Sequence, residues 1–417
     1  MSSAAGVGKR PPKLAIVKPD FGASGGFERH LDKLIAELAK RGWDITVVGV
    51  DAQTRPDHLA GLPVTTEMLH HHDDFFLLMG LIDRVKQLDL SGYDIVMSTQ
   101  PPTYLVDHPC KVALFFHHAR QFYDLADLFS ASGLASPTLH AQAINTIRTL
   151  ESDHVGEVAH WVAGSRHVAQ RLENFWSLPC DRISTYSAPP DSGPPEGKSP
   201  PPRNNRGPVV TVSRIEWPKR VELAIAAVHL TRSAAGLTIV GGGSRRGFTA
   251  SLDADFGSDP TLAATISDAD LWGNAGGATR HWTPSKYEPS GRVDWLTQAS
   301  DAERDALYAA AAVVVCPSHQ EDYGLTALEA MAWARPVIVC SDGGGLTEFV
   351  ADEKNGLIVE PTPQAVAEAI DRLDQDPDFA DRLGAAGRET VAEITWERAT
   401  DVVDSCLTEA LASVQSP

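Results

Sequence analysis

The fold of this chain is decided by LAIVKPD (residues 14–20), FERHLDKLIAELAKRG (27–42) and DITVVGV (44–50). The first and third segments are short apolar runs, which are typical of buried strands. The middle segment carries apolar residues at helical spacing: Leu31, Leu34, Ile35 and Leu38. Gly42 ends this helix. A strand, a helix and a strand in this order form a βαβ unit, which predicts a parallel sheet with right-handed crossovers.

The same alternation continues through the first half of the chain. Further strands are expected at 93–99, 111–117 and 160–165, and a helix at 166–176. These elements predict an N-terminal domain over residues 12–187.

A break follows at residues 188–208, APPDSGPPEGKSPPPRNNRGP, which are dense in proline, glycine and polar residues. Such a segment cannot form a core, so we expect a linker or exposed loop between domains. Alternation resumes over 209–395. Strands are expected at 208–214, 237–243, 292–297, 313–318, 336–342 and 356–360, and helices at 221–230, 301–311, 325–334 and 363–376. Residues 396–417 are expected to form a C-terminal helix that can return to the N-terminal domain.

The predicted fold class is therefore α/β, with two doubly wound, Rossmann-like parallel-sheet domains that face a cleft. Ligands of such domains bind at the carboxyl ends of the strands, and the cleft between two domains is the default site.

The composition excludes several classes of protein. With 417 residues, 43% of them hydrophobic, the chain can form two ordinary cores. A net charge of -19 argues against nucleic-acid binding and against tight attachment to anionic lipid.

Five scattered cysteines suit a reducing cytoplasm. The polar N-terminus is not expected to be a signal peptide, and no apolar run is long enough to span a membrane. We expect a cytoplasmic protein with at most peripheral membrane contact, for which KRPPK (9–13) is a thin candidate.

The most specific segment is EDYGLTALEAMA (321–332), which follows the apolar strand VVVCPS. Glu321 lies in the predicted loop and Glu329 in the second turn of the helix. Backbone N–H groups near Gly324 are helix-terminal donors that suit a phosphate. The two carboxylates can then hold two parts of one extended ligand.

A second group of residues lies in SRIEWPKR (213–220), at the end of another predicted strand. Arg214 and Lys219 are cations at a strand-to-helix turn. In a parallel sheet they stand over the same edge as the loop of Glu321, where a pair of cations can stabilise a leaving diphosphate.

Together these segments make the chain resemble the family-4, or group 1, glycosyltransferases, which are retaining enzymes with the GT-B fold. The resemblance covers almost the whole chain. It rests on ASGGFERH (23–30), HHARQFYD (117–124), VSRIEWPKRVELAI (212–225), EDYGLTALEAMAWARPVI (321–338), and GGGLTEFV with NGLIVEP (343–361).

The resemblance implies roles for the matching residues. Arg214 and Lys219 match the diphosphate-binding pair, Glu321 the contact to the donor sugar, and Glu329 the contact to the ribose. Other matching positions are close backbone approaches to the donor: Gly25, Gly26, Gly242, Tyr323, Gly324, Leu325 and Thr326.

His117 and His118 end a predicted strand, and a histidine of this region in the family faces the reacting sugar. His117 is the predicted catalytic residue, although alternation does not decide which ring points into the cleft. His118, Arg120 and Tyr123 are expected on the acceptor side, and Asp124 follows them.

No cofactor or metal is expected beyond the UDP- or GDP-linked sugar, which is a co-substrate. The run HHHDD (70–74) consists of residue types that bind metal ions, but adjacent residues rarely bind the same ion. We expect it to be an exposed polar loop.

Two departures from the family leave the donor and acceptor open. Asp322 stands where a small residue is usual, which can place a third carboxylate near the donor sugar. TYSAPPD (185–191) has Pro-Pro where many members have Asn-Gly.

The implied function is that of a retaining hexosyltransferase, which moves a sugar from a nucleotide diphosphate to a hydroxyl of a glycan, glycolipid or small metabolite. The alternatives are a non-catalytic nucleotide-sugar-binding protein and a GT-B phosphorylase or epimerase. The oligomeric state is left open.

Overall fold

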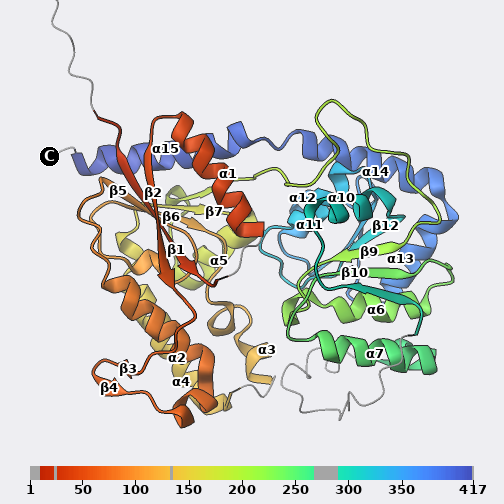
Figure 1. The fold of residues 1–417 in the computed structure, drawn as a ribbon, viewed down its shortest axis with the longest axis horizontal. Helices are drawn as coiled ribbons and strands as arrows, with labels where there is room; N and C mark the ends of the chain where they lie inside the picture. The colour runs from red at the N-terminus through yellow and green to blue at the C-terminus, as the bar shows by residue number, and fades with distance from the viewer. Residues whose placement is uncertain (1–9, 23–25, 132–134, 267–289, 416–417) are drawn as a thin grey trace, which may run out of the picture.

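The computed structural model describes residues 10–22, 26–131, 135–266 and 290–415. They form two α/β lobes that lie side by side, with the N-terminal half of the chain in one and the C-terminal half in the other (Figure 1). The predicted α/β fold class, with two doubly wound parallel-sheet domains, is confirmed.

The N-terminal domain is built on one parallel sheet. Its strands are β1 (Lys13–Asp20), β2 (Asp44–Asp51), β5 (Ile95–Ser98), β6 (Lys111–Phe115), β7 (His160–Ala163) and β8 (Ile183–Thr185). They are arranged in the order β2-β1-β5-β6-β7-β8. The helices are α1 (Gly26–Lys40), α2 (Thr66–Lys86), α3 (Ala126–Ala131), α4 (Pro137–Ser152) and α5 (Arg166–Trp176). β3 (His58–Leu59) and β4 (Leu62–Pro63) form a separate antiparallel hairpin.

The C-terminal domain repeats this plan. Its strands are β9 (Val209–Val212), β10 (Leu237–Val240), β11 (Val293–Leu296), β12 (Val313–Cys316), β13 (Val337–Cys340) and β14 (Leu357–Val359), in the order β11-β10-β9-β12-β13-β14. The helices are α6 (Val221–Leu230), α7 (Arg246–Ser258), α8 (Pro260–Thr265), α10 (Asp301–Ala310), α11 (Leu325–Ala332), α12 (Leu346–Phe349), α13 (Pro363–Gln375) and α14 (Pro377–Ala392). Short 3-10 turns occur at Thr103–Leu105, Arg120–Phe122, Val155–Glu157, Cys180–Arg182 and Trp217–Lys219.

The central strands of each sheet are buried on both faces because helices cover both sides. In β1, Ala15 and Val17 pack into one apolar cluster, whereas Leu14 and Ile16 pack into another on the opposite face. This split follows from the two-residue period of a strand.

The last helix, α15 (Trp396–Gln415), belongs to the first lobe although it follows the second in sequence (Figure 1). Val403 and Leu407 are fully buried in the same cluster as Leu14 of β1. The indole Nε1 of Trp43 donates a hydrogen bond to Asp404 at 2.6 Å. The N-terminal core is therefore completed by the C-terminal residues.

The proline-rich segment between the domains has no regular structure, yet it packs tightly against both domains. The carbonyl of Ala188 accepts a hydrogen bond from the Tyr323 hydroxyl at 2.6 Å, and the hydroxyl of Ser192 accepts one from the Trp333 indole at 2.9 Å. Asp191 forms an ion pair with Lys33 of α1 at 2.6 Å. The connection is thus held at several points.

The HHHDD run is not the exposed polar loop expected from the sequence, because it lies inside α2. His72 breaks the helical geometry with φ -166° and ψ 70° and is buried. Its Nε2 lies 2.9 Å from Nδ1 of His140, and its ring stacks on those of Phe122 and Phe129. The burial of His72 is therefore explained by its contact with His140, which is 68 residues away in the sequence.

Candidate functional site

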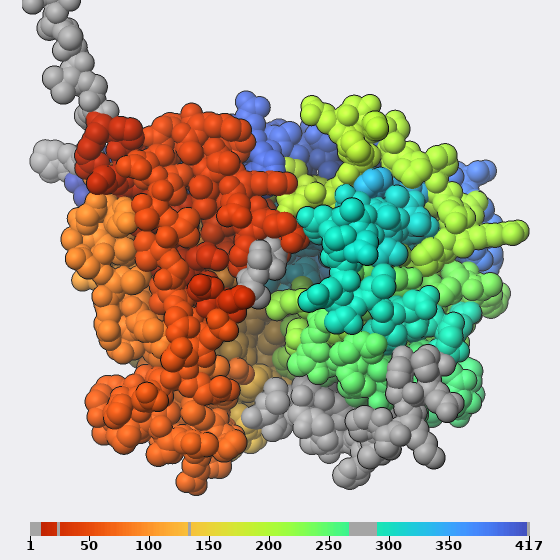
Figure 2. Space-filling view, viewed as in Figure 1, coloured from red at the N-terminus to blue at the C-terminus, as the bar shows by residue number. Residues whose placement is uncertain are grey.

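The candidate site lies where the strand order of the C-terminal sheet reverses. β9 lies next to β10 on one side and β12 on the other, so the chain leaves these two central strands in opposite directions. The loops that follow β9 and β12 open a crevice at the carboxyl edge of the sheet, which is where doubly wound sheets bind ligands. We call residues 317–324, after β12, the Glu321 loop. Figure 2 shows that the surface is hollowed between the two lobes.

Lys219 and Glu321 meet across this crevice. The Nζ atom of Lys219 donates to Oε2 of Glu321 at 2.5 Å, and the two side chains are only 22% and 15% exposed. A backbone hydrogen bond of 2.8 Å from His319 to the carbonyl of Pro218 ties the same two loops together. The structure therefore brings together two of the residues that the sequence selected.

The charge of Glu321 is stabilised by this arrangement. Burial raises the pKa of its carboxyl, but the attraction of Lys219 and hydrogen bonds from Lys219 and Ser318 outweigh burial, so that the pKa lies below its ordinary value. A carboxylate that stays ionised accepts hydrogen bonds from sugar hydroxyls.

Arg214 is exposed and lies on the loop after β9, which also leads to Lys219. The loop is packed against the glycines that follow β10: Ile215 donates to the carbonyl of Gly242 at 2.8 Å. A Cβ on Gly243 would lie 2.2 Å from the carbonyl oxygen of Ile215. The glycine run is therefore required by the close approach of the loop that carries Arg214.

The N-terminus of α11 is also shaped by a glycine. Gly324 caps the helix at φ 114°, a conformation that L-residues rarely adopt. Leu325 and Thr326 begin the helix and are partly exposed, so their backbone amides are terminal donors at the crevice. Tyr323 is buried, and its hydroxyl donates a hydrogen bond to the carbonyl of Ala188 in the linker.

Glu329 is 7% exposed and accepts a hydrogen bond from the Tyr308 hydroxyl at 2.8 Å. Burial raises the pKa of its carboxyl, against the opposing effects of Arg304 and Tyr308. The carboxylate of Glu329 is therefore largely enclosed in this structure.

The N-terminal domain faces the crevice with the start of α1 and the end of β6. A Cβ on Gly26, the first residue of α1, would lie 3.8 Å from Cδ1 of Leu325 in the other domain. Gly25, the other glycine of the predicted pair, lies outside the described residues.

The structure separates the two histidines that the sequence left undecided. His117 is partly exposed near Asp322 of the second domain, and its Nδ1 lies 2.7 Å from the carbonyl of His118. Because a carbonyl only accepts, Nδ1 is the protonated nitrogen and Nε2 is left as an acceptor. Burial lowers the pKa of His117, although Asp322 opposes this. The neutral form of the His117 ring is therefore favoured.

His118 is fully buried in the N-terminal core. Its ring centroid lies 4.3 Å from that of Tyr123 and 4.5 Å from that of Trp176. Tyr123 is 3% exposed, and its hydroxyl donates to Glu151. The acceptor-side positions predicted for His118 and Tyr123 do not fit this placement, because both side chains are enclosed by apolar and aromatic residues.

Arg120, which the sequence predicts on the acceptor side, is engaged in ion pairs. It binds Asp124 at 2.7 Å and lies 3.4 Å from Asp322 of the second domain. Asp322 therefore points toward arginines of the first domain, which its position beside Glu321 did not reveal. Arg171 of α5 is the other arginine, and sequence reasoning missed it because the arginine and Asp322 are 151 residues apart.

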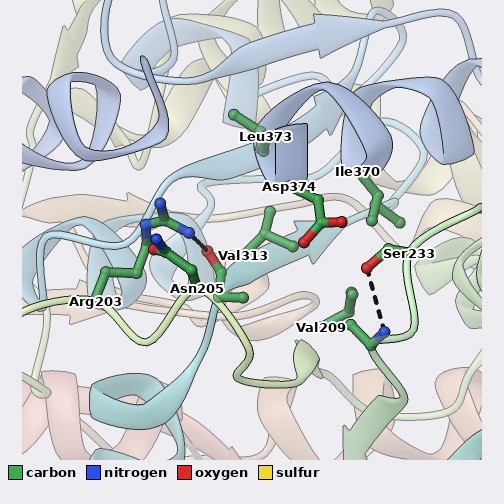
Figure 3. Close-up of a pocket in the computed structure, with 10 residues that line it drawn as sticks. Arg203, Asn205, Val209, Ser233, Val313, Ile370, Leu373 and Asp374 are labelled. Atoms are coloured by element: carbon green, nitrogen blue, oxygen red, sulfur yellow. Dashed lines mark hydrogen bonds between the residues drawn. The ribbon is translucent and has the colours of Figure 1, made fainter. Parts of the chain in front are cut away.

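Figure 3 shows a second depression, lined in part by Arg203, Asn205 and Ser233. Its walls include Val209 and Val313, the first residues of β9 and β12. It therefore lies at the amino edge of the sheet, opposite the crevice, and contains none of the candidate residues.

The described residues were compared with two structural requirements, one for a metal site and one for a membrane-spanning helix. Across the described ranges, no cluster of three or more His, Cys, Asp or Glu side chains is arranged to hold a metal ion. Within the same ranges, no helix combines the length and the apolar character needed to cross a membrane.

Part of this chain is similar in sequence to known proteins. Residues 283–390 match the sequence model of the family "Glycosyl transferases group 1". Alpha-maltose-1-phosphate synthase of Mycolicibacterium smegmatis is 45% identical over 98 residues, which cover 22% of this chain and 25% of the relative. D-inositol 3-phosphate glycosyltransferase of Thermobifida fusca is 35% identical over 159 residues, which cover 37% of this chain and 36% of the relative. The chain is thus matched over about a quarter to a third of the length of these relatives.

Solved structures match the whole fold. Sucrose-phosphate synthase of Thermosynechococcus elongatus superposes with a TM-score of 0.64 at 21% identity, over 96% of this chain and 100% of that one. WaaG, a glycosyltransferase involved in lipopolysaccharide biosynthesis, gives 0.61 at 15% identity, over 97% and 100%. At these identities the likeness shows the fold alone. Residues 283–390 are thus similar in sequence to the group 1 glycosyltransferases, and the described residues share the two-domain GT-B fold of these solved structures.

Proposed function

We propose that this chain is a retaining glycosyltransferase, which moves a sugar from a nucleotide-diphosphate donor to the hydroxyl of a glycan, glycolipid or small metabolite. The observation that carries the proposal is the ion pair of Lys219 and Glu321 at the reversal point of the C-terminal sheet, with Arg214 exposed on the same loop as Lys219.

The donor's diphosphate would lie against Arg214, Lys219 and the first amides of α11. These groups supply positive charge where negative charge grows as the sugar leaves. Glu321 would hold the sugar hydroxyls through an oxygen that Lys219 does not occupy, and Glu329 would reach the ribose. HepE of Anabaena, which shares the fold with a TM-score of 0.53, was solved with UDP-glucose, and this supports a nucleotide-sugar donor.

His117 would act from the first domain. Its Nε2, free to accept, would take a hydrogen bond from a hydroxyl of the donor sugar or the acceptor. No carboxylate needs to act as a covalent nucleophile in the proposed reaction, in contrast to retaining glycosidases. Attack would occur from the face that the diphosphate leaves, and the leaving phosphate would accept the proton of the acceptor hydroxyl.

The first experiment is calorimetric titration of the purified protein with UDP and with GDP, because binding of one over the other identifies the donor class. Release of that nucleotide from a matching sugar donor is then measured with and without acceptors. Arg214→Ala is expected to lower turnover at least about tenfold. Arg232→Ala, which removes a mostly exposed arginine paired with Asp371 elsewhere in the same domain, is the matched control.

Near-normal turnover of Arg214→Ala would exclude the role given to that residue. Donor binding with no transfer to any acceptor would favour the non-catalytic binding protein. Conversion of the donor without an acceptor would indicate an epimerase, and a requirement for free phosphate would indicate a phosphorylase.

A further inference from the structure

An arginine of the first domain reaches into the Glu321 loop of the second. Arg171 lies in α5 and is only 4% exposed. Its guanidinium donates to the carboxylate of Asp322 and, at 2.6 Å, to the carbonyl of Gln320. These two partners flank Glu321 in sequence, so one planar side chain holds the loop on both sides of the carboxylate proposed to bind the donor sugar.

The loop that Arg171 holds is strained. Gln320 has φ 49°, in the left-handed region that residues other than glycine rarely occupy. Its amide donates to the carbonyl of Asp342 at 2.8 Å, and the next amide, of Glu321, donates to the carbonyl of Gly343 at 3.0 Å. Such a conformation persists only where the surroundings fix it, and one of the fixing groups here comes from the other domain.

The rest of α5 reinforces this junction. Ser165 caps the helix and also donates from its hydroxyl to the carbonyl of Asp322 at 2.6 Å. Glu348 of the second domain accepts from the backbone amides of Arg166 and His167 at 3.0 and 2.6 Å. Two further terminal amides of α5 are thus bound by a carboxylate of the opposite domain, which the helix dipole favours at this end.

The charges of the two domains are complementary at this junction. Asp322 is 21% exposed, and burial raises the pKa of its carboxyl, but Arg120, Arg171 and His117 outweigh burial and hold the pKa well below its ordinary value. On the side of the first domain, Asp124 lies 3.3 Å from Arg171. The junction is an ionised network that exists only when the domains are together.

We infer that Arg171 is a positioning residue for the donor-sugar site: by holding Asp322 and the Gln320 carbonyl, it fixes Glu321 only while the two domains are in contact. We call the contact of Arg171 with Asp322 and the Gln320 carbonyl the latch. Asp322, its partner in the second domain, stands where the family has a small residue. The inference rests on the proposed function for its catalytic consequence, whereas its structural half stands on the contacts alone.

The structural half is tested by hydrogen exchange of the ligand-free protein, followed in peptides that span residues 318–324. Arg171→Met and Asp322→Asn are each expected to speed exchange of the amides of Gln320 and Glu321 at least about tenfold, because the loop can open more often. Arg55→Met removes an arginine from the exposed Arg55–Asp73 pair inside the first domain and is the matched control, with no change expected. Unchanged exchange of the loop in both latch variants would overturn the inference.

The catalytic half is tested with UDP, GDP and their glucose and mannose conjugates. In both latch variants, the affinity for the free nucleotide is expected to stay within about threefold of wild type, because the latch does not contact the predicted nucleotide site. The extra affinity conferred by the sugar is expected to be lost, kcat for transfer to fall at least about tenfold, and the share of donor lost to water to rise. Equal losses of nucleotide and nucleotide-sugar affinity would contradict a role confined to Glu321.

Arg171→Lys separates charge from geometry. Lysine keeps the charge but lacks the planar fork that binds two partners at once, so exchange and kcat are expected to lie between those of wild type and Arg171→Met. Full wild-type behaviour would contradict the two-point hold. If the wild type binds no nucleotide, the proposed function fails, yet the exchange experiment still decides whether the latch exists.

Discussion

Lys219 and Glu321 form an ion pair of 2.5 Å between the loops that leave β9 and β12, the two central strands of the C-terminal sheet. The pair gives each member a task in the proposed reaction. Lys219 keeps the carboxylate ionised and orients it, and it supplies a positive charge at the place proposed for the diphosphate.

Replacing Lys219 by methionine tests this coupling through the pH–rate profile. Without the lysine, burial is opposed less strongly, so the pKa of Glu321 rises. The acidic limb of kcat/KM is therefore expected to move to higher pH, with a fall in kcat of at least about tenfold at its plateau. An acidic limb that stays in place would mean that Glu321 is not the group whose ionisation is required.

Glu329 is predicted to contact the ribose, although Tyr308 already binds its carboxylate in this structure. Glu329→Gln is expected to weaken nucleotide binding at least about tenfold, measured by calorimetry, because a charged acceptor for hydroxyl groups is lost. Tyr308→Phe is the control: it removes only the internal hydrogen bond and is expected to lower stability by about 1 kcal/mol. Equal effects of both variants on stability, with nucleotide affinity unchanged, would make Glu329 a structural residue.

Replacement by phenylalanine is expected to affect stability at His118 and turnover at His117. Both ring nitrogens of His118 are buried without a partner among the described residues, and its neighbours are aromatic. His118→Phe should therefore keep or raise the melting temperature, because an unsatisfied polar ring is replaced by an apolar one. His117→Phe should leave the melting temperature nearly unchanged and lower turnover. A large loss of turnover in His118→Phe with the fold intact would reverse the assignment.

Glu151 should make the N-terminal domain less stable as the pH rises. Burial raises the pKa of this carboxyl from 4.5 to about 7, although the hydroxyls of Tyr104 and Tyr123 oppose the shift. Between these two values the folded state binds more protons than the unfolded state, so stability decreases with increasing pH. The loss attributable to Glu151 is about 3 kcal/mol by pH 7 and above.

The measurement is chemical denaturation of wild type and Glu151→Gln at several pH values between 4.5 and 8. Taking the difference between the two proteins cancels the opposite effect of His30 and His72, whose pKa values burial lowers to about 4. The variant is expected to gain stability relative to wild type as the pH rises. A constant difference would mean that Glu151 does not titrate in this range.

The sequence predicted the sheets well because buried parallel strands and their helices carry strong local patterns. The bounds of α5 and α6 agree with the predicted helices at 166–176 and 221–230. α2 was missed because its apolar residues are interrupted by HHHDD, and the burial of His72 depends on His140, 68 residues away.

The sequence predicted those site residues that directly follow a strand, because the carboxyl ends of parallel strands lie at one edge of the sheet. Glu321 and Lys219 could be placed at one edge because each follows a strand of the same parallel sheet, whereas their ion pair was not predicted. The choice between His117 and His118 required the packing of Tyr123 and Trp176 around one ring. The latch between Arg171 and Asp322 required the relative placement of two domains, which no local pattern contains.

The return of α15 to the first lobe has a consequence for the order of synthesis. A ribosome completes the six strands of the N-terminal sheet long before it reaches Val403 and Leu407, which share a core cluster with Leu14. Until those residues emerge, that face of the sheet is covered only in part, by α1, whereas the second domain already has its described strands and helices. The nascent chain therefore exposes an apolar surface on its first domain while the second can fold, and a holding chaperone would be most useful during that interval.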